Sequence, residues 1–197
     1  MENPPSARRA APAEVDLVAT IFGLALAQDP LWSRALRTLP LEQRAPLWHL
    51  FVEGGIRHSW TWLADGGAAA SVWIPPGETE LGPEQEAQVD EFALQLGPGE
   101  ADFRELLSRF DAAHPHAEPH YYLSLLGTHP EHRGRGTGMW LLAHDLALID
   151  AEHHAAYLES SNPRNDARYR SVGFEPVGEF SYPGNGPVVT TMWRLPR

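Results

Sequence analysis

The sequence THPEHRGRGTGMWLL places three glycines and two arginines at the start of an apolar, helix-forming run. The first backbone N–H groups of a helix have no partner within the helix, and with the helix dipole they attract an anion. Gly134, Gly136 and Gly138 leave the backbone open to a bulky phosphate, while Arg133 and Arg135 can pair with its oxygens. The spacing indicates a phosphate-binding turn, and the alternative is an ordinary glycine-rich loop with solvated arginines.

Two other anion-binding motifs fit this stretch poorly. A P-loop needs Gly-Lys-Ser/Thr at the helix entrance, and the stretch has no lysine. A dinucleotide fingerprint needs Gly-x-Gly-x-x-Gly directly after a strand, but Met139 stands at the third glycine position and six residues separate Gly127 from Gly134. The sequence therefore argues against an NTPase, and Glu159, about 20 residues further on, is a weak match to the dinucleotide pattern.

A family resemblance follows from this stretch and a second one downstream. LLGTHPEHRGRGTGMWLL resembles the acyl-CoA signature Arg/Gln-x-x-Gly-x-Gly/Ala of the GCN5-related N-acetyltransferase (GNAT) superfamily, with Arg133, Gly136 and Gly138 in the defining places. LESSNPRNDARYRSVGF resembles the second cofactor motif of that family, in which Asn162 and Tyr169 fall seven residues apart. WLADGGAAASVWIPP and YLESSNPRNDARYRSVGF are further similar to the puromycin N-acetyltransferase-like branch, so the likeness runs from about residue 7 to residue 195.

The resemblance implies an α/β (α+β) GNAT fold, whose mixed, mostly antiparallel central sheet splays open between two parallel strands and is flanked by helices. It implies acetyl-CoA in the gap as acyl-donor co-substrate, and no metal. The pyrophosphate would lie on the N–H groups of the glycine turn, and the pantetheine arm would pair with the backbone of the preceding strand. The cofactor-binding residues implied are Leu126, Thr128, Arg133, Gly134, Arg135, Gly136, Thr137, Gly138, Asn162 and Asn165.

By the same resemblance, Tyr169 points at the thioester sulfur and protonates the departing thiolate after direct attack in a ternary complex. A thiol with a pKa of about 8.5 is more acidic than a phenol with a pKa of about 10, so donation of a hydrogen bond can suffice. The alternative reading of Tyr169 is a core aromatic on a short helix.

Acetyl transfer also needs a neutral amine. An amine with a pKa of about 10.4 costs about 4.6 kcal/mol to deprotonate at pH 7. Glu159 is the first candidate to anchor or deprotonate the ammonium; the alternative is a strand carboxylate that faces solvent or pairs with an arginine. His120, Tyr122 and Ser124 on the preceding strand are candidates for a base that acts through water.

Several further residues allow two readings each. Asn162 and Asn165 can cap the short helix, contact the cofactor, or both. Three histidines between residues 114 and 120 have loose metal-ligand spacing, but the proline-rich loop and the absence of carboxylate support argue against zinc. Five tryptophans line an aromatic acceptor pocket or pack in the core, and none is assigned as a binder: Trp32, Trp48, Trp60, Trp62 and Trp73.

The elements that must position these residues follow from hydrophobic spacing and turn residues. Helices are expected over 13–27, where Asp29-Pro30 ends the run, and over about 41–54, where Gly54-Gly55 stops it. The turn Asp65-Gly66-Gly67 predicts an antiparallel hairpin, and the acidic stretch 78–110 predicts two helices interrupted at 97–100. Further along the chain, the sequence predicts a strand over 121–128 and then a helix with an apolar stripe from Met139 to Ile149 and His153 and His154 at its end. A strand over 156–161, a short helix over 163–171 and a hairpin with loop 183–187 follow. A strand-helix-strand unit of this length implies parallel neighbours.

Composition sets the outer limits. The chain has 197 residues, which suits one GNAT domain over 1–197 with 1–12 frayed, and no cysteine, which excludes thiolate chemistry. The apolar run VATIFGLALA is far shorter than a membrane span and lacks a leader's basic flank and cleavage site, so a cytoplasmic protein without membrane contact is expected. A formal charge of −11 disfavours nucleic acid and favours a cationic small molecule.

Taken together, these features predict an N-acetyltransferase that moves an acetyl group from acetyl-CoA to a primary amine of a small molecule, an antibiotic being one candidate. The alternatives are a protein N-terminal or lysine acetyltransferase, and a non-catalytic acyl-CoA-binding sensor. A monomer or a homodimer is expected.

Overall fold

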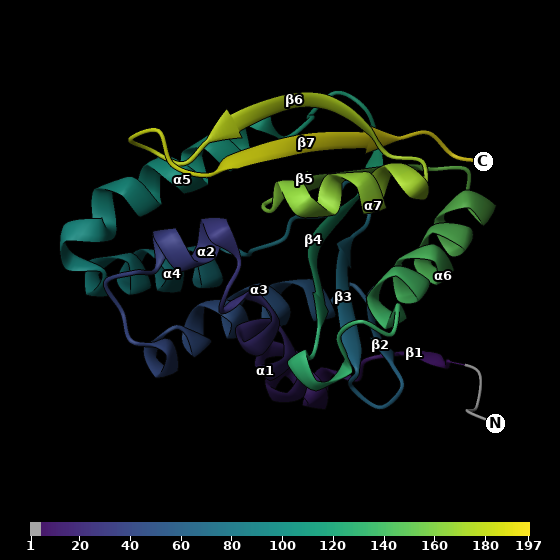
Figure 1. Ribbon diagram of the computed structural model, residues 1–197, viewed down its shortest axis with the longest axis horizontal. Coiled ribbons are helices and arrows are strands. Elements are labelled where there is room, and N and C mark those ends of the chain that lie inside the picture. Colours follow the sequence, from purple (N-terminus) through teal and green to yellow (C-terminus); the bar gives the residue numbers. More distant parts are fainter. Residues whose placement is uncertain (1–4) are drawn as a thin grey trace.

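The computed structural model describes residues 5–197, whose strands form one seven-stranded sheet in the order β1-β2-β3-β4-β5-β7-β6 (Figure 1). The strands are β1 Ala7–Arg9, β2 Thr61–Ala64, β3 Ala69–Ile74, β4 His120–Thr128, β5 Ala155–Ser160, β6 Glu175–Ser181 and β7 Val188–Arg194. Neighbouring strands are antiparallel except β4 and β5, which are parallel. This is the mixed, mostly antiparallel sheet that the family resemblance implies.

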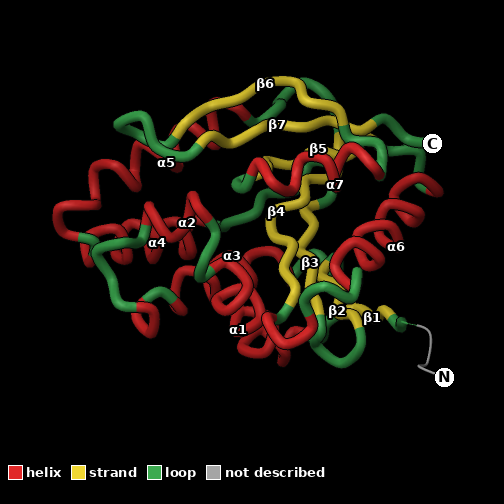
Figure 2. The backbone as a smooth tube through the Cα atoms, in the orientation of Figure 1, coloured by secondary structure: helices red, strands yellow, loops and turns green. Residues whose placement is uncertain are grey.

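Helices cover both faces of this sheet, and Figure 2 shows α6 on the opposite side of β3 and β4 from α1 and α3. They are α1 Val15–Leu26, α2 Pro30–Ala35, α3 Ala45–Ile56, α4 Pro83–Gln95, α5 Glu100–Ala113, α6 Thr137–Ala151 and α7 Asp166–Ser171. One core joins α1 to α5 with Val72 and Leu125 of the sheet. The other joins α6 with Trp73 and Leu123. The connection from β4 to β5 runs through α6, as the strand-helix-strand pattern predicts.

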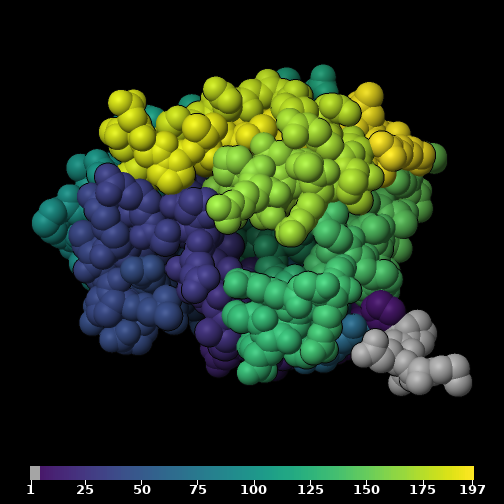
Figure 3. Space-filling model, in the orientation of Figure 1, coloured from purple at the N-terminus to yellow at the C-terminus, as the bar shows by residue number. Residues whose placement is uncertain are grey.

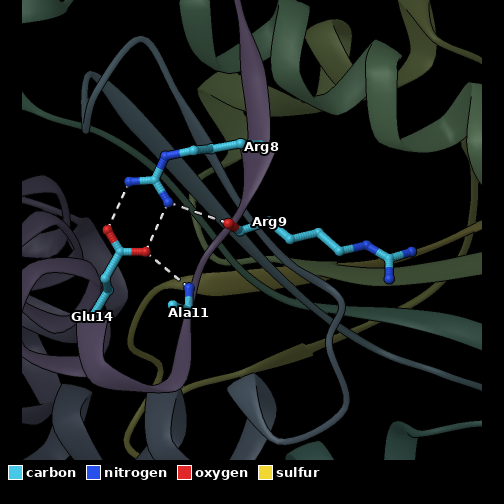
Figure 4. Close-up of polar contacts among 4 residues, drawn as sticks. All are labelled: Arg8, Arg9, Ala11 and Glu14. Carbon is cyan, nitrogen blue, oxygen red and sulfur yellow. Dashed lines mark hydrogen bonds and ion pairs between the residues drawn. The ribbon is translucent and has the colours of Figure 1, made fainter.

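The edge strand β1 is short but formed, since Ala7 to Arg9 pair with Ala64 to Trp62 of β2. Figure 4 shows Arg8 and Arg9 pointing in opposite directions from it. Arg8 makes two hydrogen bonds of 2.7 and 2.6 Å to the carboxylate of Glu14, which also accepts the amide of Ala11 at 2.8 Å. Arg9 lies over the rings of two tryptophans on the other side. The expected fraying of residues 1–12 stays a prediction, and residues 1–4 lie outside the described part of the chain.

Two expectations about the helices are corrected. Helix α3 does not stop at Gly54-Gly55 but runs through both glycines to Ile56. A Cβ atom on Gly55 would lie 2.2 Å from Cγ1 of Val72, so the missing side chain lets the helix approach β3 closely. Asp29-Pro30 follows the first helix but also starts α2, which the sequence reading missed. The Asp29 carboxylate caps α2 by accepting two amides, with proline at the first helical position.

The other predicted elements are confirmed with small shifts at their ends. The Asp65-Gly66-Gly67 turn joins β2 to β3, and all three residues have positive φ, as a tight hairpin requires. The acidic stretch forms α4 and α5, interrupted by a 3-10 turn at Gly97–Gly99. No helix among residues 5–197 is long and apolar enough to cross a membrane.

Candidate active site

The parallel strands β4 and β5 separate halfway along β4. Their pairing covers His120 to Leu123 and ends there. At the same point β4 has a bulge: Leu123 pairs with Trp73 and Leu125 with Val72, so Ser124 is an extra residue. Leu123 packs in the α6 core and Leu125 in the opposite core, although alternate residues of a regular strand share a face. The bulge therefore turns β4 away from β5, which produces the splay expected from the resemblance.

A cavity of about 740 Å³ fills this splay. Its lining includes Leu126 on β4, Glu159 at the end of β5 and Tyr169 on α7, so the two predicted catalytic residues face one space. Figure 3 shows the surface hollowed between the segment of α7 and the segment that leads into α6. The tertiary structure thus brings together residues that the sequence analysis had found only as separate motifs.

The turn that enters α6 presents a row of free backbone donors. The six amides from Gly134 to Met139 donate no hydrogen bond to any acceptor among residues 5–197, and no side chain caps the helix. Gly134 and Gly136 have φ of 81° and 79°, a conformation that favours glycine, and a Cβ on either would meet nothing within 4 Å. This is the open, donor-rich helix entrance that an anion requires.

Gly138 and Arg133 have different surroundings from those expected. A Cβ on Gly138 would lie 2.4 Å from Oγ1 of Thr128, so this glycine allows α6 to contact the end of β4 rather than baring the turn. Arg133 donates a hydrogen bond of 2.8 Å from Nη2 to the carbonyl oxygen of Ala25 near the end of α1. Arg135 is exposed, and its guanidinium makes no hydrogen bond or ion pair with the described residues. Arg133 anchors the turn, and Arg135 is the arginine whose donors are open.

Beyond the bulge, β4 has backbone amides that do not pair with a neighbouring strand. His129 donates its amide to the carbonyl oxygen of Ala68, the residue just before β3. Because successive amides in a strand point to opposite sides, those of Leu126 and Thr128 point away from β3, toward the gap left by β5. These are the two residues for which the resemblance implies a contact with the pantetheine arm.

Tyr169 lines the cavity with its ring against Phe174, at a centroid distance of 6.2 Å. Burial and the nearby carboxylates of Asp29 and Asp166 raise the pKa of its hydroxyl to about 12. Asp29 reaches this place because Ser161, just after β5, donates to it at 2.9 Å. The phenol therefore stays protonated at neutral pH, and its O–H can donate a hydrogen bond into the cavity.

Glu159 neither faces solvent nor pairs with an arginine, the two alternatives that the sequence left open. Its side chain is 3% exposed, and its basic neighbour is His114, whose Nδ1 lies 3.8 Å from Oε1. Burial first, and the Glu159 charge second, raise the pKa values of Tyr122 and Tyr157 far above the ordinary value for tyrosine. The carboxylate thus stands among neutral hydroxyls inside the cavity.

The sequence analysis missed Glu80, which lies in the segment between β3 and α4 and lines the same cavity. Ser124, the bulge residue, donates a hydrogen bond to its carboxylate. Burial raises the Glu80 pKa to about 7, the Ser124 hydrogen bond opposes this shift, and the Glu159 charge adds to it. No motif marks this residue, because its neighbour Ser124 is 44 residues away in the chain.

The histidine cluster adjoins the same space. Nε2 of His120 lies 3.3 Å from Nε2 of His114, and its Nδ1 lies 2.7 Å from the carbonyl oxygen of Glu118. Burial lowers the pKa of His120, so its ring is neutral at pH 7. Within residues 5–197 no group of three or more His, Cys, Asp and Glu side chains is arranged to hold a metal ion.

The asparagines and tryptophans divide between structure and site. Asn162 caps the turn before α7 by accepting the amide of Arg164 at 3.2 Å, while Asn165 accepts a hydrogen bond from the side chain of Arg168. Capping by Asn162 is confirmed, and contact of either residue with a cofactor stays a prediction. Trp32 and Trp48 line the cavity. The other three tryptophans, Trp60, Trp62 and Trp73, lie in the core on the α6 face.

Comparison with known proteins identifies the fold. No family model matches the chain. The structure of histone acetyltransferase HPA2 and related acetyltransferase from Corynebacterium glutamicum matches 98% of this chain and 97% of that one, at 23% identity and a TM-score of 0.65. Arylalkylamine N-acetyltransferase 2 from Aedes aegypti matches over 99% and 100%, at 14% identity and a TM-score of 0.74. Polyamine N-acetyltransferase from Drosophila melanogaster, which forms N-acetylagmatine, matches over 98% and 100%, at 18% identity and a TM-score of 0.68.

The chain therefore has the fold of the GCN5-related N-acetyltransferases, as the two motifs predict. The likeness to the puromycin N-acetyltransferase-like branch stays a prediction.

Proposed function

We propose that this protein is an N-acetyltransferase that moves an acetyl group from acetyl-CoA to a primary amine of a small molecule. The observation that carries the proposal is the row of open amides at the entrance of α6, next to a cavity that holds Tyr169 and Glu159. The three acetyltransferases with this fold include enzymes named for arylalkylamine and polyamine acceptors, which supports an amine as the acceptor class.

The residues present fit the diphosphate of coenzyme A. Six consecutive amide donors and the free guanidinium of Arg135 can bind its oxygens, and the turn at Gly134 and Gly136 has no side chain in the way. Thr137 is buried at the start of α6 and contributes one of these amides. The amides and carbonyls of Leu126 and Thr128 would hold the pantetheine arm, and Asn162 and Asn165, in the turn before α7, would contact the co-substrate as well. The bound co-substrate would supply an acetyl thioester at the splay.

The proposed role of Tyr169 is to donate a hydrogen bond to the sulfur that leaves. Transferring a proton from a hydroxyl with a pKa of about 12 to a thiolate whose acid has a pKa of about 8.5 is uphill by about 5 kcal/mol. A hydrogen bond stabilises the developing thiolate without that cost, so Tyr169 acts as a thiolate stabiliser. Glu159 would anchor the acceptor as an ammonium ion.

The charge of the cavity supports a cationic acceptor. Six carboxylates line it, while none of its described lining residues is an arginine and the chain contains no lysine. The carboxylates belong to Glu78, Glu80, Glu86, Asp111, Glu118 and Glu159. A cation entering this space is attracted by them, whereas an acceptor with its own carboxylate is repelled.

Two assays test the proposal. Coenzyme A should raise the melting temperature, because a ligand at 100 times its Kd adds about 2.7 kcal/mol of stability. A panel of primary amines, with peptides bearing free N-termini or lysines as a second panel, is then screened with acetyl-CoA for thiol release. Mass spectrometry of the products should show an acetylated small amine. Thermal shift without thiol release from any amine would indicate a binding protein, and labelling of peptides alone would indicate a protein acetyltransferase.

A further inference from the structure

The segment that carries Glu80 is held in place by contacts from α3 and from the two residues that follow it. A Cβ on Gly54 would lie 2.2 Å from the carbonyl oxygen of Glu80, so the helix backbone touches this segment directly. Arg57 donates to the carbonyl oxygen of Thr79 at 2.7 Å, and Nε2 of His58 lies 2.9 Å from the same oxygen. These contacts fix the backbone next to Glu80 and leave the carboxylate as the part that enters the cavity.

The carboxylate of Glu80 meets the bulge of β4. Ser124 is present as an extra residue at the point where β4 and β5 part, and its hydroxyl donates to Glu80. Tyr122 lies two residues before Ser124 and pairs with Tyr157, which lies two residues before Glu159. Alternate residues of a strand share a face, so Tyr122 and Glu159 lie on one face of the sheet. Glu80 and Glu159 thus approach Tyr122 from different elements. The charge of each raises the pKa of Tyr122.

This pair of carboxyl groups has little positive charge to balance it. The groups that face Glu80 are Ser124 and Tyr122 from β4, Glu159 from β5 and His114, which follows α5. Arg57 and His58, which follow α3, are engaged with Thr79. Burying two carboxyl groups without an arginine or lysine favours a neutral form of one of them. A carboxyl group that exchanges its proton near pH 7 is suited to general base catalysis at that pH.

Aromatic rings also line this cavity. Trp32 stacks on Phe110 with an interplanar angle of 4° and meets the edge of Trp48 at 85°. Phe51 of α3 and Leu107 of α5 line the space beside them. A cavity that combines this apolar surface with two carboxyl groups suits a molecule with an apolar body and an ammonium group at one end.

From this arrangement we propose that Glu80 is the general base of the reaction, and that the acceptor is an arylalkyl or alkyl amine whose ammonium group lies between Glu80 and Glu159. This inference rests on the proposed function. Glu80 takes one proton from the ammonium ion; the neutral amine then forms the C–N bond to the acetyl carbon as the C–S bond breaks. Tyr169 donates a hydrogen bond to the leaving sulfur, which ends as the thiol with the second amine proton. Glu80 returns its proton to solvent, so one proton is released for each amide and thiol formed.

The test compares two acceptors of the same shape that differ in basicity. Phenylethylamine, or another basic primary amine found in the screen, is a cation at pH 7, whereas the matching alkoxyamine, here O-benzylhydroxylamine, is already neutral. We expect Glu80→Gln to lower kcat/KM for the basic amine by about 10² to 10⁴-fold and for the alkoxyamine by less than about tenfold. A glutamate that only supports the cavity would give equal losses with both acceptors, and that result, or full activity of Glu80→Gln with the basic amine, would overturn the proposal.

Two controls separate this result from misfolding and from failure of the proposed function. Glu84→Gln removes the same charge from an exposed residue at the start of α4 and should leave kcat/KM unchanged. Glu80→Gln should bind coenzyme A with the wild-type Kd; if even the wild-type protein neither binds coenzyme A nor releases thiol, the proposed function itself is wrong.

A pH profile provides a further test. Ser124→Ala removes a hydrogen bond that lowers the Glu80 pKa, so the rise of kcat/KM with pH should move to higher pH. An unmoved rise would contradict the role of Glu80.

Discussion

Gly54 of α3 lies against the carbonyl oxygen of Glu80, so closely that a Cβ atom on the glycine would come within 2.2 Å of it. The contact is between two backbones, which have no side-chain rotamer with which to relieve a clash. Helix α3 therefore sets the position of the segment that enters the cavity, and the size of one residue decides whether that segment fits.

Replacing Gly54 with alanine should consequently displace the Glu80 segment. We expect Gly54→Ala to lower the free energy of unfolding by about 1 to 3 kcal/mol, the usual cost of overpacking, and to lower kcat for a basic amine. Gly23→Ala in α1 is the matched control, because its Cβ would meet only the Trp48 ring at 3.4 Å and alanine favours a helix. Urea denaturation of both variants measures the difference. Equal stability of the two variants would contradict the close contact.

A second prediction concerns the turn at the entrance of α6. Gly136→Ala places a side chain on a residue with φ of 79° in the row of open amides, whereas Gly184→Ala does the same at φ of 68° in the β6–β7 loop. Both sites have empty space around the new Cβ, so the backbone strain is similar. Calorimetry should show coenzyme A binding weakened by about tenfold or more in Gly136→Ala, since about 1.4 kcal/mol lost from the amide contacts has that effect. Similar weakening in Gly184→Ala would mean that backbone strain, and not the loss of contacts with the open amides, is responsible.

The third prediction is that Tyr169→Phe lowers kcat by about 10² to 10⁴-fold, because the leaving sulfur loses its hydrogen-bond donor. The ring and its contact with Phe174 remain, so the Kd for coenzyme A should stay near the wild-type value. Stopped-flow turnover and calorimetry on the same sample measure the two quantities. Unaltered turnover would remove Tyr169 from the mechanism.

The pH dependence of stability provides a fourth prediction. The pKa of Glu80 rises from 4.5 to about 7 on folding. The folded protein therefore holds this proton more tightly than the unfolded chain, and the contribution to stability is present below pH 4.5 and lost as the pH rises to about 7. At pH 8 the charged, buried carboxylate costs up to about 3 kcal/mol. Glu80→Gln should accordingly be more stable than the wild type at pH 8 but not at pH 4, as measured by urea denaturation. If Glu80→Gln is less stable than the wild type at pH 8, the charged Glu80 carboxylate does not destabilise the folded protein.

The fifth prediction concerns acceptor choice. Phenylethylamine and phenylalanine share a ring and an amine, but the amino acid carries a carboxylate in addition. Because six carboxylates and no arginine line the described cavity, kcat/KM should be at least about 10²-fold higher for phenylethylamine, equivalent to about 2.7 kcal/mol of repulsion and lost hydration. Thiol release measured with both compounds provides the ratio. Equal rates would show that the carboxylates do not face the acceptor.

Much of the fold was predictable, because local signals mark it. The glycine turn, the hairpin at Asp65 and the apolar stripe of α6 each show within a short stretch of sequence, and the structure has all three. The errors came where a local signal has two meanings. Gly54 and Gly55 read as a helix stop because glycine weakens helices, yet here the packing against β3 and the Glu80 segment requires glycine inside the helix.

At the site, the glycine-rich turn with its arginines and the position of Tyr169 in a motif were predictable, since each depends on residues close together in the chain. Folding was needed to show that Gly138 allows contact with Thr128, that Arg133 anchors the turn to α1, and that Glu80 joins Glu159 in one cavity. This is because burial and the charge of a neighbour distant in the chain set the protonation state of a carboxyl group. Those neighbours are brought together by the bulge at Ser124 and by α3, across long stretches of sequence without a repeating pattern.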